Sequence, residues 1–216
     1  MRIAFVHDII QFSVPLGTTM IAGSLRHGGH EVDVFVVEND LDKTIRELEQ
    51  YKPDVVAFSV ITGSHQEYII IARSIKQKLN IPIIWGGPHA TFSPKIVEED
   101  YADAVCVGEG EEAVIEFANA FDSEGKKLPT KIANFWVKIN GKIYRNAVRP
   151  RNKSLDDLPY AARDLFFDKF PILKQHGIKH FIAHRGCPHK CSYCFNHTYN
   201  KMYLEQAGDK KVLFSR

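Results

Sequence analysis

The chain has 216 residues, of which 44% are hydrophobic and 25% are charged, and its formal net charge is +2. That length suits one large domain, or one domain and part of a second. A net charge so near zero gives no strong electrostatic field, so the charge does not indicate nucleic acid as a partner. The apolar stretch after Met1 and Arg2 is too short for a secretory signal and no stretch is long enough for a membrane span, so we expect a cytoplasmic protein.

Short apolar strands alternate with helical patterns over residues 1–127, which we take as the first domain. The predicted strands cover 3–6, 32–37, 54–59, 82–85 and 104–107, and the predicted helices cover 16–27, 42–51, 65–79, 94–99 and 111–121. Such alternation predicts right-handed crossovers between parallel strands. The fold class is therefore α/β, with a doubly wound parallel sheet of five strands covered by helices on both faces.

Loops that leave the carboxyl ends of the predicted strands contain small and polar residues. In doubly wound sheets, ligands bind at this edge, where exposed backbone lets a large flat or phosphorylated ligand approach. The candidate residues are Ser59, Thr62, Gly63, Gly86, Gly87, His89, Gly108, Glu109 and Gly110. The glycines can equally serve only to turn the chain into the next helix, and His89 can be a polar loop residue. No G-x-G-x-x-G follows the first strand, so a dinucleotide is not favoured. Cys106, within a strand, is expected to be a small buried apolar residue.

The alternation of strand and helix patterns stops at residue 128, and we expect residues 128–177 to form a β-hairpin and a linker. Asn140-Gly141 separates two alternating runs, 133–139 and 142–145, and is a strong hairpin signal. The following stretch, 148–164, has no clear period and contains the turn-favouring residues Pro150, Ser154, Asp156, Asp157 and Pro159. Three phenylalanines are expected to dock this linker on a neighbour: Phe166, Phe167 and Phe170.

A further strand is predicted over 180–183, and it leads into a loop with three cysteines, Cys187, Cys191 and Cys194. Cysteines clustered in a chain without a secretory signal indicate metal ligation. Three thiolates hold three irons of a [4Fe-4S] cluster and leave the fourth iron open to the amino and carboxylate groups of S-adenosylmethionine. Tyr193 suits a loop that faces adenine.

Structural zinc is the alternative for these thiolates. Its fourth ligand would be a histidine such as His184, His189 or His197. Zinc sites usually carry paired C-x-x-C knuckles, and this segment has a single such pair, so the spacing favours the iron-sulfur cluster.

The segment 186–194 resembles the cluster motif of radical S-adenosylmethionine enzymes, with Tyr193 at its aromatic position. The loops 59–63, 86–91 and 108–111 resemble those of the Rossmann-like cobalamin-binding domain that precedes the radical domain in one class of these enzymes. The resemblance implies cobalamin, a [4Fe-4S] cluster and S-adenosylmethionine as cofactors. It further implies reductive cleavage of S-adenosylmethionine for methyl transfer or related radical chemistry on a small-molecule substrate, with an electron donor such as flavodoxin or ferredoxin.

Two features depart from that family pattern. Asp8 is followed by Ile9 and Ile10, so the D-x-H-x-x-G pattern that supplies a histidine to cobalt is missing, and the lower face of cobalt would lack that ligand. Only 22 residues follow Cys194, so we expect residues 178–216 to be the weakly supported start of a truncated radical (β/α) barrel, inactive as this fragment alone. The alternatives are a corrinoid-binding module without catalysis and a zinc-stabilised interaction domain.

Overall fold

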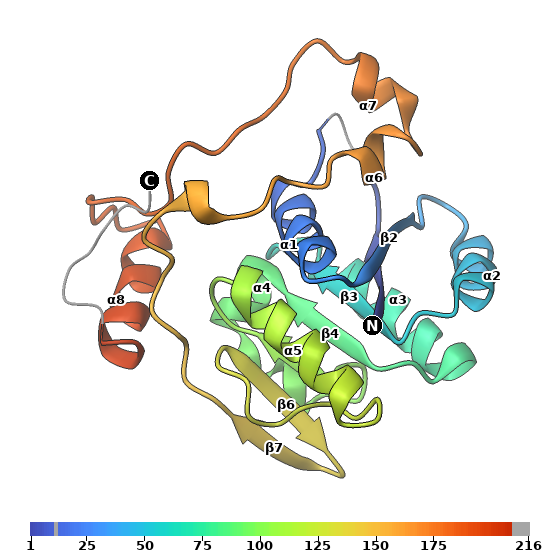
Figure 1. The fold of residues 1–216 in the computed structure, drawn as a ribbon, viewed down its shortest axis with the longest axis horizontal. Coiled ribbons are helices and arrows are strands. Elements are labelled where there is room, and N and C mark those ends of the chain that lie inside the picture. The colour runs from blue at the N-terminus through green and yellow to red at the C-terminus, as the bar shows by residue number, and fades with distance from the viewer. Residues whose placement is uncertain (11–12, 209–216) are drawn as a thin grey trace.

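The computed structural model describes residues 1–10 and 13–208 of the chain. The centre of this part is a seven-stranded sheet with the spatial order β2-β1-β3-β4-β5-β6-β7 (Figure 1). The strands are β1 (Arg2–His7), β2 (Glu31–Val36), β3 (Val55–Ser59), β4 (Ile83–Gly86), β5 (Ala104–Cys106), β6 (Phe135–Ile139) and β7 (Lys142–Arg145). β1 to β5 pair in parallel, which confirms the predicted doubly wound sheet. Among the residues described, no helix is long and apolar enough to cross a membrane.

Helices cover both faces of this sheet (Figure 1). The α-helices of the described residues are α1 (Leu16–His27), α2 (Leu41–Tyr51), α3 (His65–Leu79), α4 (Gly87–Phe92), α5 (Glu111–Ser123), α6 (Asp164–Phe167), α7 (Pro171–Gln175) and α8 (Asn196–Gln206). Two 3-10 helices accompany them, η1 (Pro94–Glu98) and η2 (Leu155–Asp157). Helices α1 and α5 pack on one face, and α2 and α3 pack on the other. Their limits follow local signals, as where the Asp40 side chain accepts the Lys43 N–H at 2.8 Å and starts α2.

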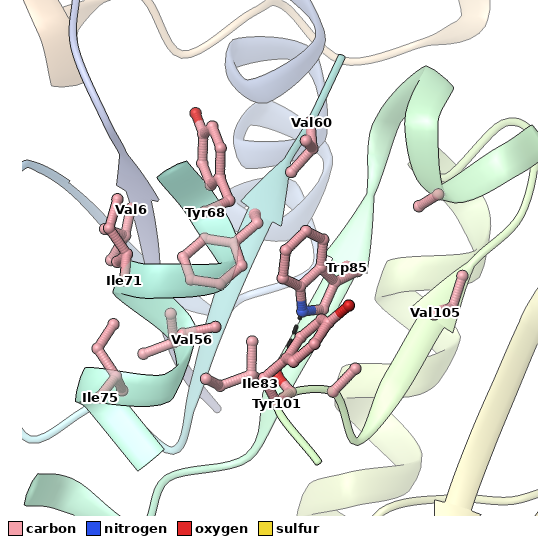
Figure 2. Packing of buried hydrophobic residues seen from close by; sticks show 14 of the residues in the cluster. Val6, Val56, Val60, Tyr68, Ile71, Ile75, Ile83, Trp85, Tyr101 and Val105 are labelled. Atoms are coloured by element: carbon pink, nitrogen blue, oxygen red, sulfur yellow. Dashed lines mark hydrogen bonds between the residues drawn. The ribbon is translucent and has the colours of Figure 1, made fainter. Parts of the chain in front are cut away.

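Strand β3 shows why the sheet has two hydrophobic cores. Val55 and Ala57 point to the core under α1 and α5, whereas Val56 and Phe58 point to the core under α2 and α3. The second core is filled by aromatic rings around the fully buried Trp85 (Figure 2). A strand buried on both faces reads as a continuous apolar run, and this is the pattern of the sequence here.

The predicted hairpin is confirmed and also extends the sheet. β6 and β7 pair antiparallel across the turn, where Asn140 and Gly141 have φ values of 50° and 77°. β6 in turn pairs antiparallel with β5, with Ala104 opposite Val137. The sequence predicted the hairpin but not its place at the edge of the sheet. The hairpin covers the outer edge of β5, whose backbone N–H and C=O groups would otherwise lack partners in the sheet.

The linker returns across the molecule to α1 and β2 (Figure 1), an attachment site that the sequence did not predict. Phe166 is fully buried in the core under α1, and Phe167 and Phe170 pack against the same core. The linker backbone is also bound, because the Ala162 N–H donates to the Thr19 carbonyl at 2.8 Å. This contact holds the linker to helix α1.

The strand predicted over 180–183 is wrong. These residues are exposed and have no strand assignment, and the only pairing nearby is an isolated bridge at Arg185. A strand needs a neighbour to satisfy its backbone, and this segment finds none within the described residues. The segment 178–184 is therefore weakly packed against the rest of the protein, as expected. Helix α8, which the sequence did not predict, is well packed, because its Tyr203 is fully buried.

Candidate functional site

A cavity of about 530 Å³ lies between the sheet and helices α1 and α5. Its deep end is apolar, with walls from β1, β3 and α5 such as Phe5, Ala57 and Ala118. Its outer end reaches the carboxyl ends of the strands and the segment 182–199. The size and the mainly apolar lining are those of a site for a small molecule or cofactor.

Six of the nine strand-end residues proposed from the sequence line this cavity. They are Ser59, Gly86, Gly87, Gly108, Glu109 and Gly110. Thr62, Gly63 and His89 are not part of its walls and lie at the rim. There, Thr62 Oγ1 and His89 Nδ1 form a hydrogen bond of 3.0 Å, and the His89 ring stacks on His65 with centroids 4.3 Å apart. Burial, and to a smaller extent His65, lower the pKa of His89.

The segment after β4 was expected to be a loop, and this expectation is wrong because residues 87–92 form helix α4. Pro88 stands in its first turn, where its missing N–H costs nothing. The helix starts against β3, with the Val60 N–H donating to the Gly86 carbonyl and the His89 N–H to the Val60 carbonyl, both at 2.9 Å. Gly87 has a φ of +85°, and a Cβ there would lie 2.7 Å from the Val60 nitrogen. Gly87 is therefore required by this close crossing.

The loop after β5 is held in place by α8. The Glu109 N–H donates to the Tyr203 hydroxyl at 2.7 Å. Residue 108 is a glycine, and a Cβ at this position would overlap the same hydroxyl. Burial raises the pKa of Tyr203 to about 12, so this phenol stays protonated at neutral pH. The Glu109 carboxyl is itself buried, and burial raises its pKa against the opposing effect of Arg185.

Two polar atoms in the cavity wall have no hydrogen-bond partner in the described part of the chain. These are Thr18 Oγ1, on the fully buried side of α1, and Glu109 Oε1. Buried polar atoms are normally bonded, so both could bond to polar groups of a ligand. Sequence reasoning missed Thr18, although a hydroxyl residue on the sheet-facing side of a helix was a usable signal.

The cysteine motif occupies one loop that leaves Arg185. Cys187 and Cys194 are half-buried and Cys191 is exposed. The Cys194 N–H donates to the Cys191 carbonyl at 3.1 Å, and Asn196 Nδ2 donates to Cys194 Sγ at 3.4 Å. Across the described ranges, no three His, Cys, Asp or Glu side chains are close enough together to bind one metal ion. The three thiols therefore lie on one loop without converging on a common point.

The two remaining sequence candidates behave differently from each other. Tyr193 is 91% exposed and is not part of the cavity wall. Cys106 is buried in β5, and burial raises the pKa of its thiol to about 12, which confirms its expected role as a small apolar residue.

An arginine that the sequence reasoning missed connects the cysteine loop to the cavity. The Arg185 guanidinium donates to the Glu111 carboxylate, and its Nη1 lies 3.6 Å from Glu109 Oε1. All three side chains line the cavity, and their charges are largely buried. Pairing with the two carboxylates raises the pKa of Arg185 although burial opposes it. No local sequence pattern marks this pairing, because the partners are far apart along the chain.

Comparison with known proteins identifies the first part of the chain. Residues 5–118 match the profile of the B12 binding domain. An uncharacterized methyltransferase of Pyrococcus horikoshii is 30% identical over 194 residues, which cover 83% of this chain and 40% of the relative. The anaerobic magnesium-protoporphyrin IX monomethyl ester cyclase of Rubrivivax gelatinosus is 28% identical over 216 residues, which cover 90% of this chain and 38% of the relative. This chain thus spans about two fifths of the length of these curated relatives.

A solved structure shows the same fold. The cobalamin-dependent S-adenosylmethionine radical enzyme OxsB, with aqua-cobalamin bound, superposes with a TM-score of 0.72 at 17% identity, over 90% of this chain and 28% of the enzyme. The resemblance to radical S-adenosylmethionine enzymes with a cobalamin-binding domain is thereby confirmed. Since the matched residues make up more than half of its length, the chain belongs to the B12 binding domain family.

Proposed function

We propose that this chain binds cobalamin in the cavity and forms part of a radical S-adenosylmethionine enzyme, with a [4Fe-4S] cluster bound by Cys187, Cys191 and Cys194. The enzyme would cleave S-adenosylmethionine reductively and use it for methyl transfer or related radical chemistry on a small molecule. One observation carries this proposal. The cavity wall is built jointly by the strand-end loops of the B12 binding domain and by the segment 182–199, which contains the cysteine motif.

The residues of the cavity fit cobalamin. Its apolar depth suits the base of the cofactor's tail, and the open backbone at Gly86 and Gly108 suits the approach of a large ring. The Thr18 hydroxyl, and the Glu109 Oε1 atom that accepts no hydrogen bond from the described residues, can bond to polar groups of the tail and of the amide side chains. When bound, cobalamin supplies a cobalt centre that can carry a methyl group. The residues that line the cavity would bind it and orient it.

The loop after β1 offers cobalt no histidine. Its pattern departs from D-x-H-x-x-G at Ile10, and His7 is turned inward, with its ring packed edge-on against Phe166 at a centroid distance of 5.6 Å. Burial lowers the pKa of His7 to about 4, so the ring is neutral at neutral pH and buried away from the cavity. We therefore infer that the lower face of cobalt lacks a ligand from this loop.

The donor chemistry of the cysteine loop fits a [4Fe-4S] cluster with one open iron, because three thiols lie within eight residues and none is in a disulfide. When bound, such a cluster supplies the electron that cleaves S-adenosylmethionine. Tyr193, exposed beside Cys194, would face the adenine. The electron donor would be a flavodoxin or ferredoxin, and cluster assembly would bring the three thiols together.

Cobalamin binding is tested by filling the cavity. Ala57→Leu places a larger apolar side chain in the cavity wall, and Ala147→Leu adds the same group at an exposed site. Titration with hydroxocobalamin, followed by absorbance, should give binding about tenfold weaker or worse for Ala57→Leu, since overpacking typically costs 1–3 kcal/mol. Ala147→Leu should bind as the wild type does. Equal binding by all three proteins would rule out this cavity.

Cluster binding is tested by anaerobic reconstitution with iron and sulfide. The wild type and Cys106→Ala should show [4Fe-4S] absorption and four irons per chain as expected for such a cluster, and Cys191→Ala should lose both. Zinc without iron in the purified protein would instead select the zinc-stabilised interaction domain. Cobalamin binding with no cluster in the wild type would select the corrinoid-binding module.

A further inference from the structure

Arg185 stands directly before the cysteine loop and reaches across to the cofactor cavity. Its guanidinium donates to Glu111, lies 3.6 Å from Glu109 Oε1, and contacts Met20 Sδ at 3.4 Å. The Arg185 side chain is 20% exposed and each of the two carboxylate side chains is 8% exposed. Charges this deeply buried are stable only when paired, so breaking the contact leaves an uncompensated charge.

The partners of Arg185 come from three separate elements of the cavity wall. Met20 belongs to α1, Glu109 to the loop after β5, and Glu111 to the first turn of α5. Helices α1 and α5 form one side of the cavity, so Arg185 spans its mouth from one helix to the other. A planar guanidinium can contact all three groups at once, whereas an ammonium offers a single point of charge.

A second connection holds the same loop from the opposite side. Asn200 of α8 donates from Nδ2 to the Cys187 carbonyl at 3.0 Å, and its Oδ1 accepts from Arg151 Nη1 at 2.8 Å. Helix α8 is in turn fixed by Tyr203, whose hydroxyl accepts the Glu109 N–H. The first cysteine is thus connected to the loop after β5 by two routes, through Arg185 and through α8.

We propose that Arg185 is a positioning residue that couples the cysteine loop to occupancy of the cavity. The inference rests on the proposed binding of cobalamin in this cavity. A ligand there contacts α1, α5 and the loop after β5, so it orders the groups to which Arg185 binds. Coupling of this kind is reciprocal: a loop ordered by its cluster strengthens binding in the cavity, and an occupied cavity favours the ordered loop.

Hydrogen exchange measured by mass spectrometry on the whole chain tests this coupling, with cyanocobalamin as the probe. In the wild type, cyanocobalamin should slow exchange both in peptides covering 108–114 and in those covering 185–200, the latter by about tenfold, the effect of one charged hydrogen bond. Arg185→Met should keep the protection at 108–114 and reduce that at 185–200 to about threefold or less, the part that still passes through α8. Arg185→Lys should restore part of it, and the exposed control Arg73→Met should match the wild type.

Each outcome decides the proposal. Protection of 185–200 that stays at the wild-type level in Arg185→Met, or that is absent from the wild type while 108–114 is protected, overturns the coupling but leaves cobalamin binding intact. No protection anywhere in the wild type overturns the binding and the coupling together. If Arg185→Met does not fold, Glu111→Gln removes the Arg185–Glu111 ion pair with little change of shape, leaves the contact with Glu109, and should lower the protection at 185–200 selectively.

Discussion

Replacement of Gly87 by alanine should disrupt the crossing of β3 and α4 at the mouth of the cavity. Gly87 adopts a φ of +85°, in the left-handed region that non-glycine residues avoid. A Cβ at this position would lie 2.7 Å from the Val60 nitrogen and 2.8 Å from the Val60 oxygen. Both are backbone atoms of the buried Val60, the residue directly after β3, so no flexible side chain can move aside.

The expected loss has two sources. A left-handed φ costs an alanine about 1–2 kcal/mol. The clash also falls on atoms that make two 2.9 Å hydrogen bonds, from Val60 to Gly86 and from His89 to Val60. Stretching these bonds costs about 1 kcal/mol each. Gly87→Ala should therefore lower the free energy of unfolding by about 3–4 kcal/mol, a large part of the stability of a domain.

The neighbouring glycine provides a matched control for this prediction. Gly86 has a φ of −137°, which any residue adopts, and a Cβ there would lie 3.4 Å from the Phe58 oxygen, an ordinary contact. Gly86→Ala should change the stability by less than about 1 kcal/mol. Urea unfolding followed by tryptophan fluorescence compares the two variants with the wild type. A difference between the two variants below about 1 kcal/mol would refute the backbone explanation.

Two further predictions concern buried polar groups. Tyr203→Phe removes the acceptor of the Glu109 N–H and should cost about 1–2 kcal/mol in urea unfolding, while Tyr160→Phe, at a 98% exposed ring, should cost nothing measurable. Burial lowers the pKa of His7 to about 4, so the unfolded chain binds this proton first as the pH falls below 6.5. About 3 kcal/mol of stability should therefore be lost between pH 6.5 and pH 4; His7→Phe should abolish this loss and His27→Gln, at an exposed site, should retain it.

The parts of the fold that could be read from the sequence are those set by local signals. Helix α3 begins and ends where its apolar period predicted, at His65 and Leu79, and α1 stops before Gly28. The turn Asn140-Gly141 fixes the hairpin because both residues tolerate a positive φ. In each case a few neighbouring residues determine the backbone, so distant contacts were not needed.

The missed features depend on contacts between distant parts of the chain. The pairing of β6 with β5 and the bond from Arg185 to Glu111 join segments that no local pattern relates. The stretch 180–183 has the composition of a strand but no neighbour to pair with in the described chain, and α4 replaces a loop because Gly87 lets the chain cross β3 closely. The glycines and carboxylates of the site were visible in the sequence, but the cavity that they share was not.

The two faces of the sheet differ in a way that argues for a ligand. Under α2 and α3, the rings of Tyr68, Trp85 and Tyr101 contact one another and fill the core (Figure 2). Under α1 and α5, small residues such as Ala57 and Gly110 border a cavity of about 530 Å³. A ligand bound there would add dispersion contacts with the apolar wall and would stabilise this face. A ligand at 100 times its dissociation constant adds about 2.7 kcal/mol to the stability. If cobalamin is that ligand, this gain should be found in the wild type and be smaller in Ala57→Leu, in which the added side chain already fills part of the space.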